Sequence, residues 1–159
     1  MSDFFTEPEI NFMRQALLEA GLAASEDEVP AGAVIVDPSG HLVARGRNRV
    51  ITLNDPTAHA EIMAIREAAA SIGNYRLSGF ILYSTLEPCP MCLMAAIHAR
   101  LAGIFYGAPE PRWGAAGSLL NLAAWPGLNH RPEIKGGLLA DECRAIITNF
   151  FQNKRRRPE

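Results

Sequence analysis

Two short motifs bring together the residue types that bind zinc and move protons. The first is His59-Ala60-Glu61, and the second is Pro88-Cys89-Pro90-Met91-Cys92. A structural zinc closes its tetrahedron with four Cys or His ligands, whereas a catalytic zinc takes three and leaves the fourth position to a water. The motifs supply three such ligands, so we expect a catalytic metal site held by His59, Cys89 and Cys92. Glu61 then remains free for proton transfer.

Both motifs are expected at the N-terminal ends of helices. His59 and Glu61 stand two residues apart and would point to nearly opposite faces within a helix, so they converge only at its start. Residues 54–57 have turn and N-cap chemistry, and residues 62–70 are rich in helix formers. Pro90 suits the first position of a second helix, which residues 91–101 continue. The partial positive charges of two helix N-termini favour thiolates.

Each motif also has a more ordinary interpretation. Most His-x-Glu triplets are a helix start with a surface carboxylate, and a Cys-x-x-Cys pair can be a thioredoxin-like redox pair. The redox interpretation leaves the His59-Ala60-Glu61 motif without a role. A structural zinc would need a fourth ligand, and the remaining candidates lack ligand spacing: His41, His98, His130 and Cys143. We expect Cys143 to be a buried apolar residue of a late helix.

Length and composition favour a single domain over residues 1–159. A chain of 159 residues with 48% hydrophobic content can bury roughly 70% of its unfolded surface in one core. No apolar stretch reaches the ~20 residues of a membrane span, and the first seven residues lack the basic start of a secretory signal. Three cysteines, two of them in the metal motif, form no disulfide framework. We therefore expect a cytoplasmic protein without membrane contact.

Positive charge is concentrated late in the chain. The net charge is −2, but residues 1–80 carry 6 basic and 11 acidic side chains, and residues 81–159 carry 9 and 6. Much of this difference lies in residues 154–157, Lys-Arg-Arg-Arg, which follow Phe150-Phe151 closely. Such a pairing offers stacking surfaces and phosphate-binding cations to a nucleic acid. Basic residues at a helix C-terminus equally complement the helix dipole, and the sequence leaves both interpretations open.

The hydrophobic pattern predicts a three-layer α/β/α sandwich with a central mixed sheet of about five strands. An opening helix is expected from Glu9 to Ala20, ended by Gly21. Strands are expected at 33–36, 42–45, 81–85 and 103–107, with a turn at 37–40. Residues 108–131 are rich in Pro and Gly and form a long connection with a short apolar helix near 119–125. Connections of this length are often functional.

The two motifs match the signature of the zinc nucleobase deaminases, H-x-E followed by P-C-x-x-C. Further blocks make the resemblance more specific. The chain resembles the bacterial tRNA adenosine deaminases (the TadA type) of the cytidine deaminase-like superfamily along nearly its whole length. The blocks that carry this resemblance are residues 29–34, 55–63, 74–77, 85–89, 114–118, 129–131 and 137–143.

The resemblance implies hydrolysis of adenosine to inosine at the wobble position of a tRNA anticodon. It implies a homodimer that binds the anticodon stem-loop, with the zinc ligands and proton carrier named above. Asn48 would hydrogen-bond the flipped base through its amide, and the main chain of Ala60 would line the pocket. The residues implied to contact RNA are Asn129, Arg112, Phe151 and Arg155.

One block departs from the family. Where relatives usually have Gly-Ala-Arg-Asp-x-Lys-x-Gly-Ala, residues 107–115 are Gly-Ala-Pro-Glu-Pro-Arg-Trp-Gly-Ala. Glu110 stands in place of the Asp and is one methylene longer. Trp113 is compatible with a stacking platform for RNA, with a plug over the core or with a dimer contact.

Two other classes of function stay open. The first is a deaminase of a free nucleobase such as guanine or cytosine. Three features argue against it: Phe150-Phe151, the basic run at 154–157 and residues 129–131. The second is a non-catalytic zinc protein. The presence of Glu61 and a set of only three zinc ligands argue against it.

Overall fold

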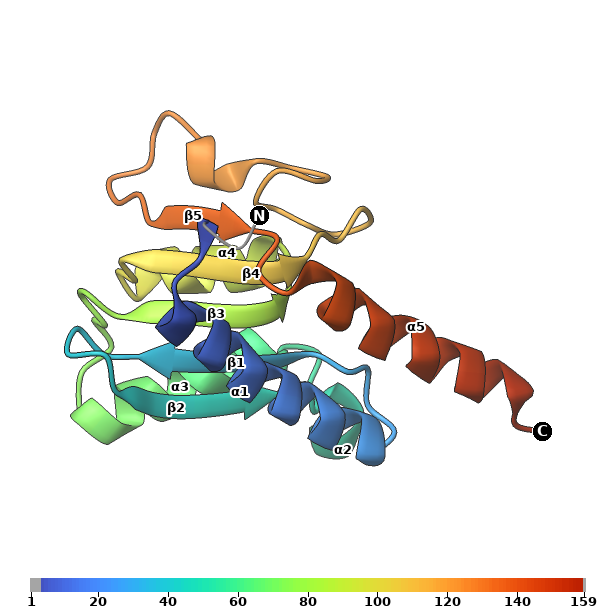
Figure 1. Cartoon of the computed structure of the whole chain (residues 1–159). Coiled ribbons are helices and arrows are strands. Elements are labelled where there is room, and N and C mark those ends of the chain that lie inside the picture. Colours follow the sequence, from blue (N-terminus) through green and yellow to red (C-terminus); the bar gives the residue numbers. More distant parts are fainter. Residues whose placement is uncertain (1–3, 159) are drawn as a thin grey trace.

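A five-stranded mixed sheet forms the centre of the computed structural model, which describes residues 4–158 (Figure 1). Residues 1–3 and 159 of the predicted domain lie outside that range. The strand order is β2-β1-β3-β4-β5, with β1 antiparallel to β2 and β3, and with β3, β4 and β5 mutually parallel. The bounds are Gly32–Val36 (β1), Leu42–Arg47 (β2), Ile81–Leu86 (β3), Gly103–Ala108 (β4) and Glu133–Gly136 (β5). This sheet confirms the predicted fold class.

Helices cover both faces of the sheet. Helices α1 (Glu7–Ser25) and α5 (Ala140–Arg156) lie on the face that Figure 1 turns to the viewer. Helices α3 (Ala60–Ile72) and α4 (Pro90–His98) lie behind it. A short α2 (Val50–Leu53) follows β2, and a single 3-10 turn, η2 (Leu122–Ala124), lies in the long connection to β5. Within residues 4–158, no helix is long and apolar enough to cross a bilayer.

Alternate residues of the strands supply two hydrophobic cores. Ala33 and Ile35 of β1 join the core under α3 and α4, and Val34 and Val36 join the core under α1 and α5. All of β1 is buried, as expected for a strand covered on both faces. Cys143 is fully buried in the second core, as predicted.

Helix α3 approaches β2 closely because residue 46 has no side chain. A Cβ at Gly46 would lie 2.2 Å from the carbonyl oxygen of Ala60 and 2.5 Å from the amide nitrogen of Ala64. Both atoms belong to the backbone of the first two turns of α3. They cannot move away from a Cβ at position 46 unless the whole helix moves. Gly46 thereby fixes the position of the helix end that carries the first motif.

The first helix is longer than predicted, because Gly21 does not end it. Helix α1 begins after Thr6, which forms a capping box with Glu9, and it continues to Ser25. Glycine costs a helix interior about 1 kcal/mol. Burial of Ala20 and Ala23 against the sheet offsets that cost. The apolar helix expected near residues 119–125 is only the single turn of η2.

Candidate active site

Two helix N-termini bring the three predicted ligands together. His59 is the N-cap of α3 and Cys89 is the N-cap of α4, both with extended backbone. Nδ1 of His59 lies 3.6 Å from Sγ of Cys89 and 3.5 Å from Sγ of Cys92, and all three ligand atoms fall within 4.8 Å of one another. In a tetrahedral zinc site, bonds of about 2.3 Å to sulfur and 2.0–2.1 Å to nitrogen place these atoms about 3.6 Å apart. The donor set therefore fits zinc.

The three ligand side chains shift one another's pKa values. A hydrogen bond from Cys92 lowers the pKa of Cys89 to about 4, and His59 contributes in the same direction. The same contact, together with burial, raises the pKa of Cys92 above its ordinary value, so its thiol stays protonated. The hydrogen bond with Cys89 raises the pKa of His59. Because metal ligands bind deprotonated, a divalent cation would replace these protons.

Glu61 lies beside this cluster in the first turn of α3. Its side chain is buried, and the burial raises the pKa of its carboxyl group. A carboxyl whose protonated form is stabilised in this way is suited to carrying a proton in a reaction.

A cavity of about 790 Å³ opens over the metal cluster. His59, Glu61 and Cys89 line it together with both predicted substrate-binding residues, Asn48 and Ala60. The structure therefore places these five predicted residues around one cavity.

Asn48, which lines this cavity, has a side-chain amide with one unpaired atom. Its Nδ2 donates to the carbonyl oxygen of Val29 at 3.4 Å. Its Oδ1 is buried and has no hydrogen-bond partner among the described residues. A buried acceptor without a partner costs about 1–3 kcal/mol, and among the residues that line this cavity Asn48 carries that cost.

Two buried glutamates that we did not predict also line this cavity, Glu28 and Glu87. Glu28 accepts hydrogen bonds from the amides of Ile51 and Thr52 and from the Thr52 hydroxyl, at 3.1, 2.8 and 2.7 Å. Burial raises the pKa of Glu28, but these hydrogen bonds outweigh it and bring the pKa below its ordinary value. Glu28 thereby fixes α2, which contributes Val50 and Ile51 to the cavity wall. An acidic residue directly after an apolar strand was the available sequence signal for Glu87.

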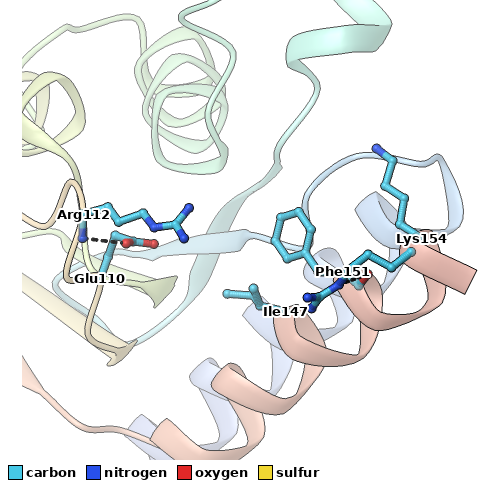
Figure 2. A pocket seen from close by; sticks show the side chains of 6 residues that line it. Glu110, Arg112, Ile147, Phe151 and Lys154 are labelled. Carbon is cyan, nitrogen blue, oxygen red and sulfur yellow. Dashed lines mark hydrogen bonds between the residues drawn. The ribbon is translucent and has the colours of Figure 1, made fainter.

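A second cavity, of about 530 Å³, separates α5 from the connection that follows β4 (Figure 2). Ile147 and Phe151 point from α5 into the space, and Arg112 reaches toward them from the opposite side. The remaining lining residues are Glu110, Lys154 and Arg155. Three of the four predicted RNA contacts, Arg112, Phe151 and Arg155, therefore border one cavity. Glu110 lines this cavity and the metal cavity alike, so the two adjoin.

Trp113 lies at the metal cavity and is 66% exposed, so it is not a plug over the core.

Asn129 lines neither cavity. Its Oδ1 accepts a hydrogen bond from Nη1 of Arg100 at 3.0 Å. The neighbouring Arg131 donates to the carbonyl oxygens of Ala123 and Trp125 at 3.2 and 2.7 Å. These contacts support the connection between β4 and β5, and an RNA contact of Asn129 stays a prediction.

Comparisons with known proteins find one family and several close relatives. The family model described as the cytidine and deoxycytidylate deaminase zinc-binding region matches residues 6–108. A tRNA-specific adenosine deaminase of Agrobacterium fabrum is 46% identical over 91% of this chain and 95% of its own. A solved structure from studies of A-to-I editing by tRNA:A34 deaminases has a TM-score of 0.83 and 46% identity, over 86% of this chain and 98% of its own. A guanine deaminase of Nitrosomonas europaea has a TM-score of 0.79 and 26% identity, over 92% and 85%.

Proposed function

We propose that this chain, which belongs to the cytidine and deoxycytidylate deaminase family and within it to the tRNA-specific adenosine deaminases, converts adenosine to inosine at the wobble position of a tRNA anticodon. The observation that carries the proposal is the shared border at Glu110. It joins the metal cavity to a cavity lined by Phe151, Arg112 and Arg155. A free base would fill only the first cavity, whereas a nucleotide within RNA would place its neighbours in the second.

Zinc is the cofactor, held by His59, Cys89 and Cys92. When bound, it supplies Lewis-acid chemistry that brings the pKa of a water in the cavity toward about 7.

Glu61 carries the protons of the reaction. It takes a proton from the attacking water, whose oxygen adds to C6 of adenine, and it delivers that proton to the ring nitrogen. It then takes the proton of the new C6 hydroxyl and delivers it to the amino group. The C6–N bond then breaks, and ammonia leaves. Adenosine and water thus give inosine and ammonia. The buried position of Glu61 supports this role, because it keeps the carboxyl group away from competing bulk water.

The flipped base is bound by Asn48 and Ala60. The side-chain amide of Asn48 hydrogen-bonds the adenine edge, and the main chain of Ala60 forms one wall. Extruding a base from the RNA costs a few kcal/mol, which contacts to the flanking nucleotides must recover.

The residues of the second cavity make those contacts with the flanking nucleotides. Phe151 stacks on a neighbouring base, and Arg112 and Arg155 meet backbone phosphates or sugars. The exposed ring of Phe151 and the cations on both sides of the cavity support these roles. Asn129 would contact RNA only at a point outside both cavities.

We also propose that residues 1–159 form a single deaminase domain, that the protein acts in the cytoplasm where tRNA is read, and that it works as a homodimer. Three exposed apolar side chains on the connection to β5 support a second copy, since they would otherwise face water: Leu119, Leu120 and Trp125. Light scattering on the purified protein tests the dimer.

Guanine deamination is the second candidate. The structural similarity to the guanine deaminase of Nitrosomonas europaea favours it. The identity of that protein to this chain is 26%, against 46% for the solved structure from the studies of tRNA:A34 deaminases. The aromatic and basic lining of the second cavity has no evident use with a free base.

Position-specific editing tests the proposal. Anticodon stem-loops of an arginine type would carry adenosine either at the first anticodon position or elsewhere in the loop. We expect inosine only in the former, detected by mass spectrometry of the digested RNA. Equal editing at every loop position would contradict a site built around flanking-nucleotide contacts.

A further inference from the structure

We propose that Glu87 is a positioning residue whose buried carboxylate holds the loop 110–118 in the shape that both cavities need. The proposal rests on the proposed function, because the substrate of that function is what these cavities receive. It concerns a residue that neither binds the metal nor transfers a proton.

Glu87 stands at the junction of the sheet and the metal motif. It follows β3 directly, precedes Cys89 by two residues and is only 2% exposed. Its amide nitrogen donates to the carbonyl oxygen of Ala108 at 2.9 Å, which ties its backbone to the end of β4. The position of this side chain is therefore set by the parallel pair β3 and β4.

All the donors that reach the Glu87 carboxylate come from one loop. The amides of Glu110, Ala116 and Ser118 donate to it at 3.2, 3.0 and 3.1 Å, and the Ser118 hydroxyl donates as well. A carboxylate is acceptor-only, with two oxygens and room for about four hydrogen bonds. Three backbone N–H groups converging on one anion form the kind of concavity that binds an anion, here supplied by the protein itself.

The loop wraps around this carboxylate without a side chain in the way. A Cβ at Gly114 would lie 2.4 Å from the carboxyl carbon of Glu87. A further bond from the amide of Ala115 to the carbonyl oxygen of Pro88, at 2.9 Å, ties the loop to the metal motif. Glycine at position 114 is thus what lets the loop close on Glu87.

The residues that this loop carries line both cavities. Trp113 lines the metal cavity, Arg112 lines the second, and Glu110 lines both. Glu110 also accepts a hydrogen bond from the amide of Arg112 at 2.9 Å, so the loop holds these two residues as a unit. If Glu87 lost its acceptors, the cavity walls would move while the three metal ligands kept their places.

Glu87→Gln tests the proposal with a side chain of the same shape. The amide group of Gln donates where the loop also donates, so at least one buried N–H loses its partner. We expect one zinc per chain, faster hydrogen exchange at one or more of the amides of Glu110, Ala116 and Ser118, and a KM for the anticodon stem-loop raised at least about tenfold. We expect kcat to stay within about threefold, because Glu61 and the ligands are unaltered.

Two variants complete the design. Glu87→Asp keeps the acceptor-only carboxylate and should restore part of the exchange protection and of the KM. Glu133→Gln alters an exposed glutamate of β5 that lines neither cavity, and it should match the parent in every measurement.

Parental exchange at all three of the amides of Glu110, Ala116 and Ser118 in Glu87→Gln would overturn the proposal, and so would loss of zinc or a fall in kcat at constant KM. If that variant does not fold, Ser118→Ala removes the hydroxyl contact alone. Faster exchange at Ala116 would then support the proposal, and parental exchange would overturn it. If the parent protein does not deaminate the stem-loop, the proposed function fails, and hydrogen exchange alone decides whether Glu87 holds the loop.

Discussion

Replacing Phe151 by alanine removes the aromatic surface of the second cavity. Phe151 is 41% exposed, and a phenylalanine side chain presents roughly 200 Å² in full, so about 80 Å² is available to a stacked base. At about 25 cal/mol per Å², this area corresponds to about 2 kcal/mol. That energy lies within the roughly 1–3 kcal/mol of base stacking on aromatic residues. We therefore expect Phe151→Ala to weaken binding of the anticodon stem-loop about 30-fold.

The assay is a titration of fluorescently labelled stem-loop at one fixed salt concentration, in a Glu61→Ala background that prevents turnover. Tyr75→Ala is the matched control, since Tyr75 is 66% exposed and lines neither cavity. This control should bind the stem-loop like its parent. Both variants should unfold at nearly the parental temperature, because exposed side chains contribute little to stability. Equal affinity of Phe151→Ala and Tyr75→Ala would refute the assignment of the second cavity to RNA.

Further predictions concern the metal, the charges and two glycines. Glu61→Ala should keep one zinc per chain by atomic absorption and lose deamination, whereas Cys92→Ala should lose both; metal loss in the first variant would contradict its role as a proton carrier. Arg155→Ala should reduce the slope of log affinity against log salt by about 1, and an unchanged slope would exclude a phosphate contact. Gly46→Ala should push α3 from β2 and lower the free energy of unfolding by about 1–3 kcal/mol, with weaker zinc binding. Gly21→Ala has free space within α1 and should instead raise that free energy by about 0.5–1 kcal/mol in a urea titration.

Local chemistry in the sequence predicted the elements that carry the metal. Cys89 before Pro90 marked a helix start, and the structure has α4 beginning at Pro90. The spacing of His59 and Glu61 required an open helix end, and His59 is the N-cap of α3. In both cases the preference of a residue for a helix end is intrinsic, so no distant contact was needed to make the prediction.

Elements whose position depends on distant contacts could not be located from the sequence. Strand β5 has no alternating apolar pattern, since its two central residues are half-buried and its ends exposed. Its place is set by parallel pairing with β4. The role of Glu87 depends on a loop that returns after more than twenty residues, and Gly21 was misjudged because packing of α1 outweighs its propensity. Likewise, the pairing of Asn129 with Arg100 could be seen only in three dimensions.

In the proposed reaction, the metal cavity acts on an adenosine that its neighbouring nucleotides hold in an RNA loop. The direct test is kcat/KM of the zinc-loaded protein on an arginine-type anticodon stem-loop, compared with free adenosine, cytosine and guanine under the same conditions. We expect inosine formation on the stem-loop with kcat/KM at least about a hundredfold above that of any free substrate, since flanking contacts position the flipped base. Comparable release of ammonia from free guanine would contradict it.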